Sequence, residues 1–129
     1  MSEPIVVVGR FTVKPGKLDD FKQFARELSR SFEAEKPRTD VFVMYLDEDG
    51  TEGTSVHVFA DAEAMDLHAE RGEELAPAAY ELLEMRGFEI YGRPSDAVLE
   101  TTRRHAGQDG LTHTPQHLTG FIRGSGGSD

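Results

Sequence analysis

The chain has 129 residues and no cysteine, with 37% hydrophobic residues, 29% charged residues and a formal net charge of −10. This length predicts one domain with its own core, and the missing cysteines exclude disulfides and thiolate chemistry. The acidic excess disfavours nucleic acid as a partner, because it would repel a phosphate backbone. We find no apolar run long enough to cross a membrane and no signal-peptide pattern. We therefore expect a cytoplasmic protein that binds neither nucleic acid nor a membrane.

The first predicted unit is a strand, a helix and a second strand. Residues 5–13 are apolar on both alternating faces, which is typical of a strand covered on both sides. Pro15 and Gly16 end this strand. A helix follows, because apolar residues recur there at helical spacing: Phe21, Phe24, Ala25, Leu28 and Phe32. Pro37 is expected to mark its end, and residues 41–46 form a second strand that is apolar on both faces.

The second predicted unit repeats this order. An acidic turn at residues 47–50 leads into a third strand at 54–60. Asp61 can cap the next helix, because its carboxylate accepts from free backbone N–H groups. Pro77 is expected to break or kink that helix, which then resumes through residues 80–83. Gly87 is expected to end it, and residues 88–92 form the fourth strand.

Two such units predict an α+β, ferredoxin-like βαββαβ fold with a four-stranded antiparallel sheet and both helices on one face. The strands are apolar on both faces, so the face without helices needs a cover. A second copy of the same sheet supplies one. We therefore expect a homodimer that forms an α/β barrel.

The C-terminal part differs in composition from residues 1–94, which we take as the folded domain. Residues 95–123 form an extension, in which 95–99 either extend the fourth strand or begin a short helix. The polar residues 103–115 are typical of a loop. Residues 117–123 form either a short added strand or a disordered tail. Residues 124–129 have the composition of a flexible linker.

Over about residues 4–94, this pattern resembles the antibiotic biosynthesis monooxygenase family of dimeric α/β barrels. The resemblance depends on the opening strand with its Lys-Pro-Gly end, on residues 45–46 before the acidic turn, and on one spaced motif. In that motif an aromatic, an Asp, an Ala and a His stand at fixed offsets, here Phe59, Asp61, Ala64 and His68.

The chain departs from the family pattern at three places. His57 stands where the family usually has Glu, and Phe59 stands where it usually has Trp. A second helix histidine has no counterpart, since Arg71 and Gly72 lie near its place. The family itself includes cofactor-free, quinol-forming monooxygenases, monooxygenases that degrade haem and many proteins of unknown role, so the fold alone does not settle the function.

The resemblance implies a pocket between the third strand and the second helix. His57 and Phe59 share one face of that strand, and His68 lies on the helix beside it. In the cofactor-free enzymes a bound phenol or hydroxyanthrone loses a proton, and its anion reduces oxygen. A base in a dry pocket is enough, so we expect no cofactor and no metal. His68 or His57 would be the base, with Tyr45 as its hydrogen-bond partner.

The expected ligand is a small aromatic or hydrophobic molecule. Apolar residues near the histidines would bind it: Phe59, Phe24, Phe21 and Met65. The phenylalanines at helical spacing also fit an ordinary core.

Three alternatives stay open at this level. His68 can be a packing histidine, and the chain a binding or regulatory domain that holds a small hydrophobic ligand without catalysis. Haem degradation would lack the asparagine and tryptophan of that subclass, because the chain contains neither residue. Haem binding through one histidine remains possible. The tail histidines His105, His113 and His117 match no zinc motif.

Overall fold

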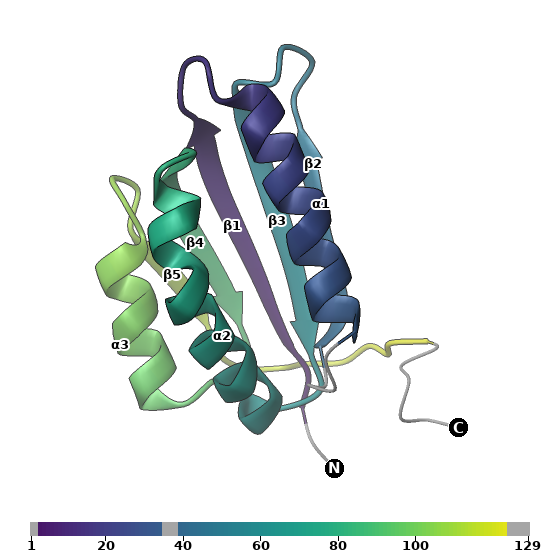
Figure 1. Ribbon diagram of the computed structural model, residues 1–129. Helices are drawn as coiled ribbons and strands as arrows, with labels where there is room; N and C mark the ends of the chain where they lie inside the picture. Colours follow the sequence, from purple (N-terminus) through teal and green to yellow (C-terminus); the bar gives the residue numbers. More distant parts are fainter. Residues whose placement is uncertain (1–2, 35–38, 124–129) are drawn as a thin grey trace.

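The computed structural model describes residues 3–34 and 39–123. Its elements in chain order are β1 Ile5–Val13, α1 Leu18–Ala34, β2 Thr39–Leu46, β3 Glu52–Phe59, α2 Ala62–Tyr80, β4 Leu83–Tyr91, α3 Asp96–His105 and β5 Leu111–Thr114. The three helices lie side by side over one face of the sheet (Figure 1). No helix in the described ranges covers the opposite face.

The sheet has five strands in the order β2-β3-β1-β4-β5. The first four pair antiparallel, whereas β5 pairs parallel to β4. The predicted α+β, ferredoxin-like βαββαβ arrangement is therefore confirmed. The predicted sheet of four antiparallel strands was wrong, because the extension adds a parallel strand at the β4 edge.

The extension folds differently from the prediction. Ser95 caps α3, since its hydroxyl accepts from the backbone N–H of Val98. Part of the expected loop 103–115 is instead the strand β5, whose Leu111 packs against the core while Thr112 is exposed. Residues 117–123 form no strand. A four-residue strand carries too short an alternation to be recognised from sequence.

The path of α2 also differs from the prediction. The helix continues through Pro77 and ends at Tyr80, so of the expected break or kink at this proline the break was wrong. Pro77 is exposed and lies in the last turn of α2. Its missing backbone N–H therefore costs the helix one hydrogen bond close to its end. β4 begins at Leu83, so Gly87 does not end a helix; it lies within the strand, opposite Arg10. The expected end of α1 at Pro37 falls outside the described residues.

The core lies between the sheet and the helices. Alternate residues of β1 point into it and are buried: Ile5, Val7, Gly9, Phe11 and Val13. The Phe11 ring also requires glycine at position 53 of the neighbouring strand, because a Cβ there would collide with this ring. The helix-facing side of the sheet is thus closely packed at this end.

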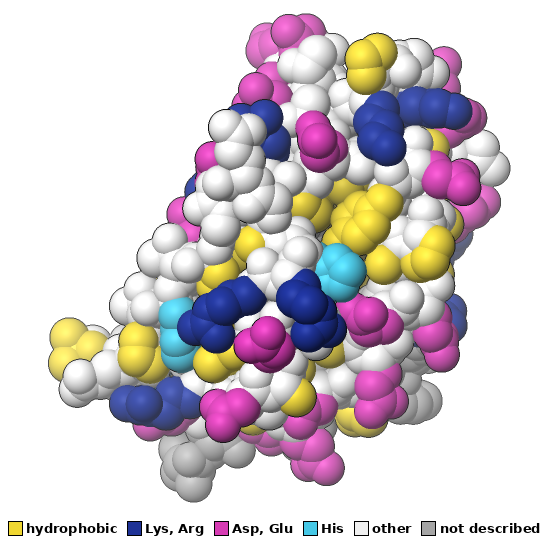
Figure 2. Space-filling model, turned by 90° about the vertical axis from the view of Figure 1, so that its left-hand side faces the viewer, with side chains coloured by type: hydrophobic (Ala, Val, Ile, Leu, Met, Phe, Trp, Pro, Cys, Tyr) yellow, Lys and Arg dark blue, Asp and Glu magenta, His cyan; other side chains and the backbone are white. Residues whose placement is uncertain are grey.

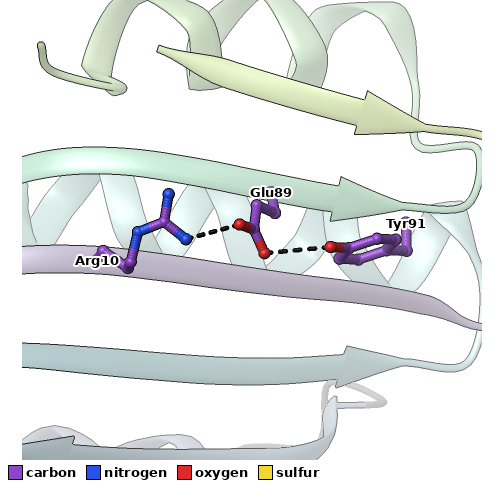
Figure 3. A network of polar contacts seen from close by, with 3 residues as sticks. All are labelled: Arg10, Glu89 and Tyr91. Carbon is purple, nitrogen blue, oxygen red and sulfur yellow. Dashed lines mark hydrogen bonds and ion pairs between the residues drawn. The ribbon is translucent and has the colours of Figure 1, made fainter. Parts of the chain in front are cut away.

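The other face of the sheet, here called the outer face, carries an apolar stripe with a polar network beside it. The stripe consists of Val6, Val8, Val41, Val43, Val56 and Val58. In the network, the Arg10 guanidinium donates to Glu89 at 2.6 Å, and the Tyr91 hydroxyl donates to the same carboxylate at 3.1 Å (Figure 3). The Arg10 hydrogen bond lowers the pKa of Glu89 and raises that of Arg10.

Candidate functional site

Two apolar cavities of about 200 Å³ each lie between the sheet and α2. The first, here called the α1 lobe, opens between α1 and α2; the second, the α3 lobe, lies between α2 and α3. Both border the same group of side chains, contributed by α2, β3 and β4: His57, His68, Gly72, Ala76, Tyr80 and Phe88. These shared residues define the candidate site.

Both histidines are placed by elements whose sequence signals are clear. His57 lies on β3, with Val7 of β1 and Phe42 of β2 as its cross-strand partners, so it points toward the helices. Asp61 fixes the start of α2, because its carboxylate accepts from the N–H of Ala64 at 2.8 Å. The helix then carries His68 over β3, and the two imidazoles meet edge to face with ring centroids 4.8 Å apart.

Three phenylalanines surround the histidine pair. Phe32 of α1 lies 4.4 Å from the His68 ring, and Phe42 lies 4.9 Å from the His57 ring. Phe59 stacks on His57 at 5.9 Å and also contacts His68 at 4.9 Å, measured between ring centroids. The imidazoles therefore lie in an aromatic, weakly solvated environment.

Burial keeps both imidazoles neutral. It lowers the pKa of His57 to about 3, with a smaller contribution from the neighbouring His68, and lowers the pKa of His68 to about 4. The Nδ1 atom of each ring is buried without a hydrogen-bond partner. Both imidazoles are half-buried, and both border the two lobes. Buried polar atoms normally have partners, so the two orphaned nitrogens mark a place where packing alone leaves polar groups unsatisfied.

The structure brings together most of the predicted site residues. His57 and His68 are in contact. Phe24 lines the α1 lobe, and Phe59 and Met65 line the α3 lobe. Phe21 lies in the core against Phe11, with ring centroids 5.3 Å apart, and lines neither lobe.

Tyr45 is not near the histidines. It pairs with Thr54 and points to the outer face of the sheet, where 63% of its surface is exposed. The expected hydrogen bond to a pocket histidine was therefore wrong. The helix-facing residues of β2 are Phe42, Met44 and Leu46. Because β2 is apolar on both faces, its sequence did not reveal which set points inward.

Several pocket residues were not expected to belong to the site. The sequence predicted Phe42 and Phe88 only as strand residues, and Tyr80 only as part of the second helix. The α3 lobe also has a polar rim, where His105 Nε2 lies 3.3 Å from a Glu73 carboxylate oxygen. The view from the α3 side shows histidine, basic and acidic side chains gathered around exposed hydrophobic atoms (Figure 2). Only the fold brings these residues together.

A larger cavity, of about 420 Å³, lies elsewhere. It is on the outer face of the sheet and is bordered by charged side chains, among them Arg10, Arg86, Asp47 and Asp109. It contains no histidine, and Tyr45 is its single titratable aromatic.

Within the described ranges, no group of three or more His, Asp or Glu side chains is arranged to hold a metal ion. His105 pairs with Glu73, while His113 Nε2 lies 2.8 Å from the Gly92 carbonyl oxygen. No described helix is long and apolar enough to cross a membrane.

The fold and the site define a ferredoxin-like α+β protein with an apolar pocket around a half-buried histidine pair. The family model of antibiotic biosynthesis monooxygenases matches residues 4–88, and the chain belongs to this family. The predicted resemblance is thereby confirmed. No curated protein matches the chain in sequence.

Solved structures share the fold at low sequence identity. MupZ from Pseudomonas fluorescens is 18% identical and aligns over 96% of this chain and 98% of its own, with a TM-score of 0.71. A conserved protein from Methanosarcina mazei Go1 is 24% identical over 71% of this chain and 93% of its own, with a TM-score of 0.60. Rv0793 from Mycobacterium tuberculosis is 20% identical over 74% and 99%, with a TM-score of 0.58. The MupZ alignment spans nearly the whole chain, and the other two span a smaller part.

Proposed function

We propose that this protein is a cofactor-independent monooxygenase that oxidises a small aromatic or polyketide-like substrate, such as a quinol or an anthrone. The observation that carries the proposal is the pair of neutral histidines, each with an orphaned Nδ1, that borders two apolar lobes. A neutral imidazole can accept a proton, and a dry pocket strengthens its interaction with the anion that forms.

For an anthrone, the proposed reaction converts the ring CH₂ group and O₂ into a carbonyl and water. His57 or His68 takes the first proton from the substrate, and the resulting anion passes one electron to O₂. Superoxide and the substrate radical then combine into a peroxide anion, which takes the proton back from the imidazolium and becomes a hydroperoxide. Loss of water across the O–O and remaining C–H bonds leaves the C=O group. The substrate supplies all the electrons, so the reaction needs neither metal nor flavin.

The size of each lobe limits what it can hold. An apolar cavity of about 150 Å³ accommodates benzene in another protein, so a lobe of about 200 Å³ fits one ring or two fused rings, and the third ring of an anthrone would extend beyond it. An intact haem is much larger than either lobe. No step of the proposed reaction passes through haem.

A second candidate is a binding or regulatory domain that holds a small hydrophobic ligand without oxidising it. The low pKa of both histidines favours this candidate. A base of pKa about 4 gains little driving force when it takes a proton from a weakly acidic carbon. The same cavities would then serve only to bind.

We further propose a homodimer formed through the outer face of the sheet. Its valine stripe is partly exposed, including Val43 at 38%, and no described helix covers it. The segment after β5 carries two more exposed apolar residues, Leu118 at 86% and Phe121 at 79%. A second copy placed on the outer face would bury both features at once. A stable interface removes about 800 Å² of accessible surface from each partner, which is the area of a patch that spans several side chains.

Oxygen uptake tests the proposed activity. Purified protein is mixed with anthrone and quinol substrates in the presence of a chelator, and dissolved oxygen and product are followed. We expect turnover in the wild type and at least a hundredfold loss in His68→Ala, because general base catalysis contributes about that factor or more. His117→Ala, which changes an exposed histidine outside the pocket, is the matched control. Ligand binding without any oxygen consumption would favour the second candidate.

A further inference from the structure

The α3 lobe has one wall from a part of the chain outside the family match. The match ends at residue 88, whereas α3 follows it and contributes Thr101, Thr102 and His105 to the lining of this lobe. His57 and His68 line the same cavity. Three histidines therefore border one space of about 200 Å³, and the proposed reaction involves only two of them.

The helix α3 is held at both ends, so the place of His105 is fixed. At its start, the Ser95 hydroxyl donates to an Asp66 carboxylate oxygen at 2.7 Å. Just after its end, Gly107 has a φ of +83°, and a Cβ there would collide with the carbonyl group of Met85 in β4. Only glycine lets the chain pass so close to the strand. His105, the last residue of α3, is thus anchored beside the lobe.

Two side chains of α2 hold the His105 imidazole. Its Nε2 lies 3.3 Å from a Glu73 carboxylate oxygen, and its ring lies 5.6 Å from the Tyr80 ring, measured between centroids. The carboxylate favours a proton on Nε2, so Nδ1 is the basic nitrogen of the neutral ring. Among the described residues, this Nδ1 makes no hydrogen bond, and it does not share the burial of the orphaned Nδ1 atoms of the histidine pair. It is the atom through which His105 can act on a molecule in the lobe.

His105 also differs from the histidine pair in how well it tolerates a charge. Burial lowers the pKa of His57 to about 3 and that of His68 to about 4, so an added proton is held poorly there. The His105 side chain is 32% exposed and lies beside a carboxylate. Water and Glu73 therefore both stabilise its imidazolium form. Of the three histidines in this lobe, His105 is the one whose charged form costs least.

The proposed reaction leaves a second proton to be moved. Once the hydroperoxide has formed, the carbon that carries it keeps one C–H bond, and the loss of water requires a base to remove this proton. We propose that His105, oriented by Glu73, is that base, and that the protein dehydrates a secondary hydroperoxide to a ketone in the α3 lobe. This inference rests on the proposed function, but it can be tested without the oxygen step.

The proposed step balances without a further reactant. Nδ1 of His105 takes the C–H proton, and the electron pair of that bond becomes the second bond of the carbonyl group. The O–O bond breaks, and its outer oxygen leaves as hydroxide. The hydroxide then takes the proton from the imidazolium, which gives water and restores the neutral ring. The carbon loses two electrons, and the two peroxide oxygens gain them.

A stable hydroperoxide tests the inference directly. 1-Hydroperoxytetralin has two fused rings, which suits a lobe of about 200 Å³, and its dehydration gives 1-tetralone. The full chain is incubated with this compound and a chelator, and the ketone is followed by its ultraviolet absorbance. We expect the wild type to form 1-tetralone faster than buffer alone, and His105→Gln to lose this activity by roughly a hundredfold or more. Ketone formation by the wild type at the buffer rate would overturn the inference.

Further variants separate catalysis from the tethering of α3 to α2. Imidazole added to His105→Ala should restore ketone formation, because it replaces a base but not a structural contact. Arg104→Gln, on an exposed position of α3 outside the lobe, is the matched control and should keep full activity. Glu73→Gln, on the other helix, should lower the activity to an intermediate degree and keeps the test decisive if the His105 variants do not fold. Unchanged activity in Glu73→Gln, or no restoration by imidazole, would overturn the inference.

Oxygen uptake with an anthrone separates this inference from the proposed oxidation. His105→Gln should still consume oxygen but release the hydroperoxide in place of the quinone, because the step assigned to His105 follows the addition of oxygen. Release of quinone alone by this variant would overturn the inference and leave the oxidation standing. Formation of 1-tetralone without any oxygen uptake would support the role of His105 and contradict only the proposed oxidation.

Discussion

The rings of His57 and His68 meet edge to face at 4.8 Å, and neither Nδ1 has a hydrogen-bond partner. Charging one ring would place a cation beside the other ring and inside a shell of phenylalanines. The desolvation of that cation is what holds both pKa values low. The low pKa of the two histidines therefore determines both how the stability of the protein depends on pH and the neutral state of the imidazoles beside the pocket.

The first prediction concerns stability and pH. The pKa of both histidines in the folded protein, about 3 and about 4, lies below their ordinary value of 6.5. Below pH 6.5 the unfolded chain binds protons that the folded chain does not, so stability is complete above that pH and falls as the pH drops toward 4. Between pH 7 and pH 5 we expect a loss on the order of 4 kcal/mol from the two groups.

Urea unfolding at pH 7, 6 and 5 measures this loss. The double variant His57→Gln, His68→Gln is the comparison, because it lacks both titrating groups. We expect its free energy of unfolding to depend less on pH than that of the wild type. If the free energy of unfolding changed equally with pH in the two proteins, groups other than the two histidines would cause the pH dependence.

The second prediction concerns the pH profile of turnover, if the protein proves to be active. An exposed histidine base would lose activity as the pH falls through 6.5. The base proposed here stays neutral to about pH 4, the pKa of His68. We therefore expect a constant kcat/KM from pH 8 to pH 5 with a substrate that does not titrate in that range. An inflection near 6.5 would exclude the buried pair as the base.

The sequence predicted the four strands and two helices of the family core, because each carries a strong local signal. The apolar alternation of Ile5–Val13 and the capping carboxylate of Asp61 both appear as expected in the structure. The same reasoning placed His57 and His68 in one pocket. Strand periodicity and helix spacing together decide which side chains meet there.

What the sequence did not reveal depends on long-range packing. β5 is four residues long, and it can pair parallel to β4 only because α3 connects the two strands and returns the chain to the same end of the sheet. Tyr45 belongs to a strand that is apolar on both faces, so its direction follows from register and not from pattern. The space beside Gly72 has no local signal, because an isolated glycine in a helix has several explanations.

The third prediction tests the proposed dimer. Val56 pairs with Val8 on one side and Val43 on the other, so it lies within the valine stripe. In a sheet-to-sheet dimer, Val56→Glu would bury a carboxylate without a partner. We expect sedimentation to show dimers for the wild type and monomers for Val56→Glu. Ala78→Glu, on an exposed position of α2, should remain dimeric.

The fourth prediction concerns the segment after β5, which crosses below the sheet toward the β2 side (Figure 1). Removing residues 116–129 takes away Leu118 and Phe121, which are almost fully exposed in one chain. If these residues pack on a second copy, the truncated protein should dissociate at a protein concentration at least tenfold higher than the full chain. Leu118→Ser with Phe121→Ser should have the same effect. Unchanged dissociation would show that the segment does not contribute to the dimer.

The parallel pairing of β5 with β4 has a consequence for how the pocket exchanges its contents. β1 is hydrogen-bonded along its whole length to β3 and β4, whereas β5 pairs at four positions and has no strand beyond it. Amide protons of α3 and β5 should therefore exchange with solvent sooner than those of β1, since short peripheral units open at a lower free energy than the centre of a sheet. Because α3 lines the α3 lobe, we expect such an opening to uncover that lobe, so that a ligand bound there would exchange at the rate of local unfolding at the sheet edge.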